Sequence, residues 1–143
     1  MNTKIQTLCI PDLSAKSQQS LFEAGVPAGF PSPAGDYEED KLDLNRHLIK
    51  NPAATFFVRV AGYSMIGAGI HSGDLLVVDR SLEPRDKSVV IAVIDGELTV
   101  KRIRIGKKKI TLEPENENYS AQQITEDTDF QVWGIVTNVI HAL

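Results

Sequence analysis

Short runs of Val, Ile and Phe recur from residue 55 onward and are separated by glycine, proline or Asp-Gly. This composition is typical of β-strands joined by turns. We predict six strands, over residues 55–60, 74–79, 88–94, 97–105, 109–114 and 130–140. The short spacing between them favours an all-β sheet or a partly open barrel over βαβ units.

Two local signals refine this pattern. Asp95-Gly96 lies between two strand-like runs, which predicts a hairpin with a type I′ turn. Residues 40–50 have apolar side chains at helical spacing, behind Asp40 or Asp43 as possible caps. We therefore predict one short helix before the first strand.

The beginning of the chain has a different composition. Four of the seven prolines fall within the first 40 residues, interspersed with three glycines. Prolines interrupt both helical and ladder hydrogen bonding, so we predict an extended N-terminal arm over residues 1–39. A length of 143 residues suits a single domain, which we place at residues 40–143.

Charge and cysteine content exclude several classes of function. The net charge is -4 and the pI about 5.3, so we expect no basic face for direct, sequence-specific DNA binding. Cys9 is the only cysteine, which excludes an internal disulfide and favours the cytoplasm. No apolar run reaches the length of a signal peptide or of a membrane span, so we expect no membrane association.

Ser64 follows a predicted strand and is surrounded by Gly62, Gly67 and Gly69. A helical turn that started at Ser64 would aim the free backbone N–H groups of Ser64 and Met65 at one place, as an oxyanion hole requires. The alternative is that Ser64 is only a helix N-cap, a common role for serine.

Lys101 is the second unusual residue. A period of two places it on one face of its strand with Ile103 and Ile105. Apolar surroundings would lower the pKa of the Lys101 ammonium and let the side chain act as a base. The alternative is that this face is only partly buried and that Lys101 extends to water.

Together, the runs GYSM, GDLLVVD and DGELTVKRI resemble the peptidase domain of the LexA/UmuD family, in particular its UmuD-type members. The resemblance implies a LexA/signal-peptidase-like β-fold. It also implies an autoproteolytic serine peptidase that needs no cofactor or metal. In that family the serine of G-x-S-M is the nucleophile and the lysine of T-V-K is its base. These roles correspond to Ser64 and Lys101 here.

The resemblance also indicates a cleavage site. Residues 27–34, PAGFPSPA, would on their own be a proline-rich loop. Family members cut themselves between Ala or Cys and Gly, and GFPSPA-x-DY resembles the sequence that follows the cut in UmuD proteins. The corresponding bond is Ala28-Gly29. UmuD relatives often have Cys before the glycine of the cleavage site. Ala28 differs from them and resembles the LexA-like and mutagenesis-plasmid variants at this position.

Further expectations follow for partners. The resemblance implies a RecA filament on single-stranded DNA as co-protease. It also implies that the shortened product joins an error-prone UmuC-type polymerase for translesion synthesis in the SOS response to DNA damage. UmuD relatives are dimers, and residues 130–140 are too continuously apolar for a strand with one wet face. We therefore expect a homodimer.

Two other functions remain open. One is a non-enzymatic β-scaffold that docks to a polymerase, and the other is a fragment of a LexA-like repressor. Only 28 residues precede Gly29, too few for a helix-turn-helix domain. His47, His71 and His141 are too scattered along the chain for the usual spacing of a metal site, so we expect none.

Overall fold

The computed structural model describes residues 2–14, 18–22 and 38–143. These residues divide into two compact units. One unit contains Met1–Pro11 and Asn51–Leu143, and the other is Asp12–Lys50. The candidate catalytic residues lie in the first of these units, whereas Ala28 and Gly29 lie outside the described residues.

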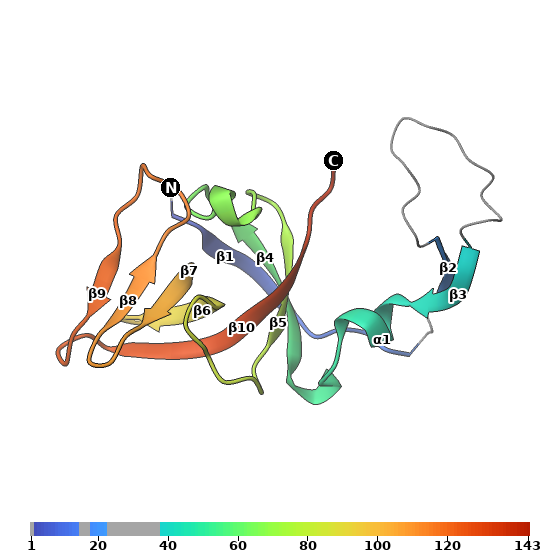
Figure 1. Cartoon of the computed structure of the whole chain (residues 1–143), viewed down its shortest axis with the longest axis horizontal. Helices are drawn as coiled ribbons and strands as arrows, with labels where there is room; N and C mark the ends of the chain where they lie inside the picture. The colour runs from blue at the N-terminus through green and yellow to red at the C-terminus, as the bar shows by residue number, and fades with distance from the viewer. Residues whose placement is uncertain (1, 15–17, 23–37) are drawn as a thin grey trace. The chain divides into compact units, whose positions relative to one another are not determined.

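The first unit is built around a closed ring of six antiparallel strands (Figure 1). In order around the ring they are β1 (Lys4–Cys9), β4 (Thr55–Ala61), β5 (Leu75–Asp79), β10 (Phe130–Ile140), β6 (Val89–Ile94) and β7 (Glu97–Ile105). The pairing of Lys4 in β1 with Thr99 in β7 closes the ring. Two further strands, β8 (Ile110–Glu113) and β9 (Gln122–Ile124), extend the sheet beyond β7.

Two hydrophobic clusters stabilise this unit, because several strands are buried on both faces. In β6, Ile91 belongs to one cluster, whereas Val90 and Ala92 belong to the other. Side chains of a strand alternate between its faces, so both faces of β6 are covered. This double burial explains why the strand reads as an unbroken apolar run rather than an alternating one.

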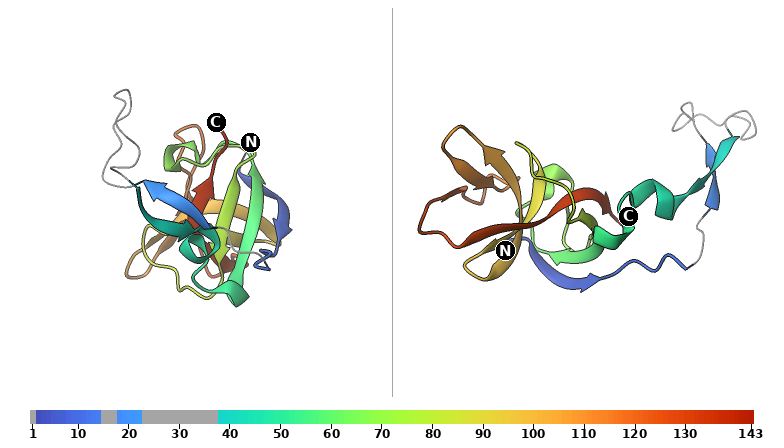
Figure 2. Two further views of the ribbon diagram at one scale, coloured as in Figure 1. Left: turned by 90° about the vertical axis from the view of Figure 1, so that its right-hand side faces the viewer. Right: turned by 90° about the horizontal axis from the view of Figure 1, so that it is seen from below.

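The predicted mainly β fold is confirmed. All six predicted strands are present within about two residues of their predicted ends, as β4 to β8 and β10. The predicted turn is also present, since Asp95 and Gly96 have φ angles of 49° and 83°, the positive values that a type I′ turn requires. Figure 2 shows the ring of strands from two further directions.

Strand β1 was not expected, because it falls within residues 1–39, for which the sequence indicated an extended arm. The structure instead pairs Lys4–Cys9 with β4 and β7, as an integral strand of the ring. Five of its six side chains are exposed, so the strand is held by backbone hydrogen bonds and lacks a hydrophobic signature. The ring is therefore closed, whereas the sequence favoured an all-β sheet or a partly open barrel.

The second unit holds a β-hairpin and the predicted helix. Strands β2 (Gln18–Phe22) and β3 (Glu38–Asp43) pair antiparallel, and helix α1 (Leu44–Leu48) follows directly. The helix is shorter than the predicted 40–50, because residues up to Asp43 belong to β3. Of the two possible caps, Asp43 fills the role, and its carboxylate accepts a hydrogen bond from the backbone N–H of Asn45.

Candidate active site

Ser64 lies in the turn that joins β4 to a short 3-10 helix, Ile66–Ala68. Gly62 begins this turn with a φ of 112°, a value that L side chains rarely adopt. A Cβ atom at Gly62 would lie only 2.2 Å from the backbone oxygen of Asn2. Glycine is required there both by the backbone conformation and by the close approach of the N-terminal segment.

Lys101 reaches the same place from β7. Its Nζ atom lies 3.2 Å from Oγ of Ser64. The ammonium also donates to Oγ1 of Thr99 at 3.1 Å and to the backbone oxygen of Val100 at 3.2 Å. The side chain is only 8% exposed, which excludes the alternative that Lys101 extends to water.

Burial lowers the pKa of Lys101 from 10.5 to about 8, because the charged ammonium loses its hydration. None of the described carboxylates forms an ion pair with this lysine that would oppose the shift. With a pKa near 8, about one molecule in ten has a neutral amine at pH 7. For an ordinary lysine the fraction would be a few in ten thousand, so Lys101 is suited to act as a base near neutrality.

Ser64 is fully buried, and Thr3 covers it. The backbone N–H of Thr3 donates to Oγ of Ser64 at 2.9 Å, and the Ser64 hydroxyl donates to Oγ1 of Thr3 at 3.1 Å. The carbonyl of Thr3 accepts hydrogen bonds from the backbone N–H of Val100 and the hydroxyl of Thr99. In this conformation the Ser64 proton is directed to Thr3, and the nucleophile is closed to solvent.

A groove of about 360 Å³ adjoins the lysine side of this pair. Its lining combines apolar side chains with acidic ones and includes Lys101, Leu98, Thr99, Leu112, Asp95 and Glu97. Asn2 and Lys4 also line it, so the N-terminal segment borders both Ser64 and the groove. An extended peptide that took the place of this segment would pass the groove and Ser64 together.

The alternative role of Ser64 as a helix cap is not observed. Met65 is the cap residue of the 3-10 helix, and this helix has no side-chain cap. The Ser64 side chain instead bonds to Thr3 and Lys101. The oxyanion hole of the Ser64 and Met65 backbone N–H groups stays a prediction, and so does the cut at Ala28-Gly29.

Sequence reasoning gave no role to two residues of this site, Thr3 and Thr99. The period of two already placed Thr99 on the same face of β7 as Lys101, but not its hydroxyl within hydrogen-bond distance of the amine. Thr3 offered no signal, since 61 positions separate it from Ser64. Two of the three histidines that seemed scattered, His71 and His141, also come together, with ring centroids 4.5 Å apart.

No helix in the described part of the chain is both long and apolar enough to cross a lipid bilayer.

Comparison with known proteins assigns the chain to a family. Residues 20–137 match the family described as Peptidase S24-like. Protein SamA of Salmonella typhimurium is 50% identical over 126 residues, which cover 88% of this chain and 87% of SamA. Protein ImpA of Escherichia coli is 48% identical over 85% of this chain and 82% of its own length. Protein MucA of Escherichia coli is 43% identical over 79% of this chain and 77% of its own length.

The family match spans most of the chain, and these relatives align over more than three quarters of their own length. The match also includes both Ser64 and Lys101, the two residues that the fold brings into hydrogen-bond distance. The chain belongs to the Peptidase S24-like family, as a UmuD-type member.

Proposed function

We propose that this chain is a self-cleaving serine peptidase of SOS mutagenesis, with Ser64 as nucleophile and Lys101 as general base. The observation that supports this proposal most strongly is the 3.2 Å distance between Nζ of Lys101 and Oγ of Ser64. Burial at the same place shifts the pKa of Lys101 toward neutrality. A nucleophile beside a base of lowered pKa is the arrangement that covalent catalysis requires.

The proposed substrate is the chain's own Ala28-Gly29 bond. Neutral Lys101 takes the proton from Ser64, and Oγ attacks the carbonyl carbon of Ala28. The backbone N–H groups of Ser64 and Met65 stabilise the resulting oxyanion. As the C–N bond breaks, Lys101 returns the proton to the nitrogen of Gly29.

The resulting ester between Ser64 and Ala28 must then be hydrolysed. Lys101, neutral again, takes a proton from a water molecule that attacks the ester carbonyl, and it passes this proton to Oγ of Ser64 as the ester C–O bond breaks. The products are the N-terminal 28 residues and a fragment of 115 residues (143 minus 28).

Thr3 gives a physical reason why this reaction would need a co-protease. While Thr3 accepts the Ser64 proton and covers Oγ, the hydroxyl is not directed at Lys101 and Oγ is closed to a substrate. The competent state requires displacement of the N-terminal segment, so only a small fraction of molecules would occupy it. A RecA filament on single-stranded DNA that bound the displaced state would increase this fraction.

Replacing Thr3 with proline should therefore accelerate unassisted cleavage. Proline lacks both the N–H and the hydroxyl that bond to Ser64, and loss of two buried hydrogen bonds corresponds to an increase of about ten- to hundredfold in the open fraction. The rate is measured as appearance of the 115-residue fragment without a filament. Thr3→Ser, which keeps both hydrogen bonds, is the control and should match the original chain. A folded Thr3→Pro protein that cuts no faster would contradict the role given to Thr3.

Cleavage would also change the barrel. Strand β1 lies upstream of the proposed cut, so after cleavage it is held only by its pairing with β4 and β7. Loss of β1 would expose the edges of two strands, and unpaired edges are the part of a sheet that binds other chains. This change accords with our proposal that the shortened homodimer joins an error-prone UmuC-type polymerase for translesion synthesis.

The cleavage site itself is tested by Gly29→Val. A β-branched residue after the scissile bond restricts the extended backbone and crowds the leaving nitrogen, so we expect loss of the 115-residue fragment. The variant should keep the circular dichroism spectrum and melting temperature of the original chain. A cut at the normal rate in Gly29→Val would refute the assignment of this bond. If the chain were a non-enzymatic scaffold, both the original chain and the Gly29→Val variant would stay intact.

A further inference from the structure

His71, Asp74 and His141 meet at one end of the barrel. His71 and Asp74 lie in the loop before β5, and His141 follows β10. Because β10 pairs antiparallel with β5, with Ile140 opposite Leu75, the residue after Ile140 lies beside the residue before Leu75. The strand register thus brings His141 beside Asp74, although 67 positions separate the two residues along the chain.

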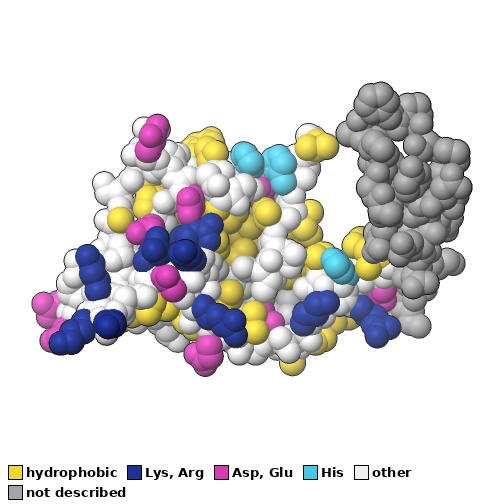
Figure 3. Space-filling view, in the orientation of Figure 1, with side chains coloured by type: hydrophobic (Ala, Val, Ile, Leu, Met, Phe, Trp, Pro, Cys, Tyr) yellow, Lys and Arg dark blue, Asp and Glu magenta, His cyan; other side chains and the backbone are white. Residues whose placement is uncertain are grey.

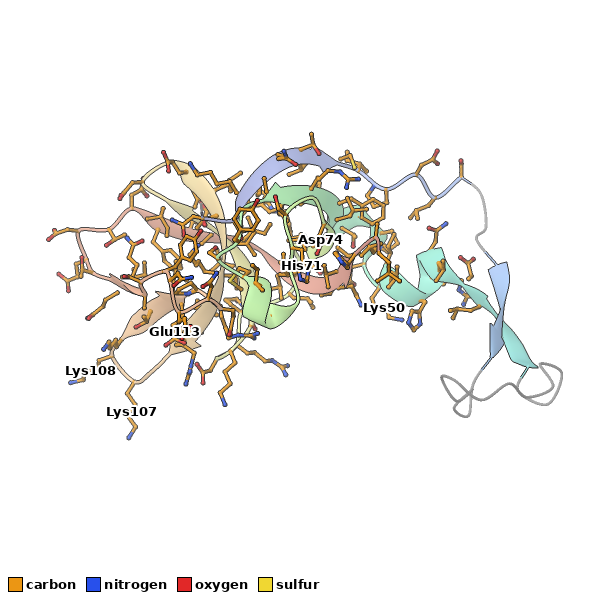
Figure 4. The ribbon with its side chains drawn as sticks, turned by 90° about the horizontal axis from the view of Figure 1, so that it is seen from above. Lys50, His71, Asp74, Lys107, Lys108 and Glu113 are labelled. Carbon is orange, nitrogen blue, oxygen red and sulfur yellow. The ribbon has the colours of Figure 1, made fainter. Side chains whose placement is uncertain are left out.

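The three side chains are in close contact. Oδ1 of Asp74 lies 2.6 Å from Nδ1 of His141, and Nδ1 of His71 lies 3.7 Å from Oδ2 of the same carboxylate. Figure 4 labels His71 and Asp74 on adjacent parts of this loop. The two imidazole rings are tilted by 34° to each other with centroids 4.5 Å apart, and a pair of adjacent histidine side chains is visible at the surface in Figure 3. One donor atom from each residue lies within 4.8 Å of the others.

The surroundings differ between the carboxylate and the imidazoles. Asp74 is only 4% exposed and is held in place by the backbone N–H of His71, which donates to Oδ2 at 2.7 Å. Both histidine side chains are open to solvent on one side. A fixed carboxylate at the base of the cluster thus faces two imidazole rings that are partly exposed to solvent.

We propose that His71, Asp74 and His141 bind a divalent cation of the zinc class. Two imidazoles and one carboxylate suit zinc and its neighbours in the transition series, whereas calcium and magnesium need more oxygen ligands. Three protein ligands also leave a fourth, tetrahedral position for water. The site is separate from Ser64 and Lys101, and it requires no part of the proposed cleavage.

Binding requires a small local contraction. Donor atoms about 2.0 to 2.2 Å from a tetrahedral metal lie about 3.3 to 3.5 Å from one another, closer than the widest separation here. Rotation of the exposed imidazoles achieves this without movement of the barrel. The metal would replace the hydrogen bond between Asp74 and His141, and the Nδ1 proton of His141 would move to Nε2.

A bound metal would link the end of β10 to a loop that is already fixed to β4. The backbone of Val60 exchanges hydrogen bonds with Gly73 and Asp74, and the hydroxyl of Ser72 accepts one from the N–H of Gly62. A ligand that binds only the folded chain raises its stability by mass action. We therefore expect the metal to increase the melting temperature rather than to change the chemistry at Ser64.

The test is a titration of the full-length chain with zinc ions, followed by calorimetry and by melting temperature, and with cobalt ions, followed by visible absorption. We expect one ion per chain, a dissociation constant in the micromolar range and a higher melting temperature. His71→Ala and His141→Ala should each weaken binding at least about tenfold. His47→Ala is the matched control, because His47 lies in α1 of the other unit, and it should bind normally.

Cys9 is an exposed thiol that could bind zinc by itself, so Cys9→Ser is titrated in parallel and should also bind normally. Lack of saturable binding below about 1 mM would overturn the proposal. So would binding that persists at full strength in both His71→Ala and His141→Ala, or that disappears in Cys9→Ser.

Discussion

Replacing either Ser64 or Lys101 with alanine is expected to abolish self-cleavage and leave the barrel folded. Without Ser64 no acyl bond forms, and without Lys101 the Ser64 proton loses the amine of lowered pKa that lies 3.2 Å from Oγ. Proton transfer by a positioned base contributes about 10²- to 10⁴-fold to a rate, so Lys101→Ala should form the fragment at least about 100-fold more slowly than the original chain. The measurement is the time course of the 115-residue fragment with activated filament.

Two substitutions elsewhere in the barrel serve as controls. Ser88 and Lys108 are residues of the same types that have no contact with the site, so Ser88→Ala and Lys108→Ala should cut at the normal rate. A folded Ser64→Ala or Lys101→Ala protein that still cuts normally would contradict the assigned roles. If both control variants also lost cleavage, the loss in Ser64→Ala and Lys101→Ala would be attributed to a disturbed fold rather than to the missing catalytic group.

The rate of unassisted cleavage should rise with pH and then level off near the pKa of Lys101. Only the neutral amine accepts the Ser64 proton, and the lowered pKa of about 8 sets the neutral fraction. The neutral fraction increases about ninefold from pH 6 to 7 and about fivefold from pH 7 to 8. Between pH 8 and 9 it increases less than twofold. The measurement is a series of first-order rates between pH 6 and 9.5, with circular dichroism to verify the fold at each pH.

Other bases would give other profiles. A histidine base would level off near pH 6.5 to 7, and a lysine with its ordinary pKa would show a rate still rising tenfold per unit at pH 9. A flat profile from pH 6 to 9 would show that neither kind of base limits the reaction. Any of these three outcomes would contradict the role of a buried Lys101.

The pairing of Ser64 with Lys101 could be proposed from the sequence because the motifs that carry them resemble those of the LexA/UmuD family; the strand pattern alone left a helix cap and a solvent-exposed lysine as alternatives. Ser64 follows the predicted strand that corresponds to β4, and Lys101 lies in β7. The alternation of side chains along β7 indicated an apolar face on the side of Lys101. That face is less uniform than predicted, since Ile103 is buried in a hydrophobic cluster whereas Ile105 is exposed. The low exposure of Lys101 therefore depends on neighbouring segments, which strand periodicity does not describe.

Strand β1 could not be predicted, because its side chains are mostly exposed and its position depends on backbone hydrogen bonds to β4 and β7. Exposed polar positions leave no periodic hydrophobic signal. The cover of Ser64 by Thr3 follows from this pairing and was missed for the same reason. Likewise, the meeting of His71 and His141 depends on the register between β5 and β10, which the separate strands do not specify.

The central claim is that the chain cuts its own Ala28-Gly29 bond, and the intact mass of the reaction products tests it most directly. The full-length chain is incubated with RecA filament on single-stranded DNA, and all products are weighed by mass spectrometry. Our proposal predicts two fragments, residues 1–28 and 29–143, whose masses sum to that of the chain plus one water. An intact chain after prolonged incubation, or fragments that correspond to a different bond, would contradict it.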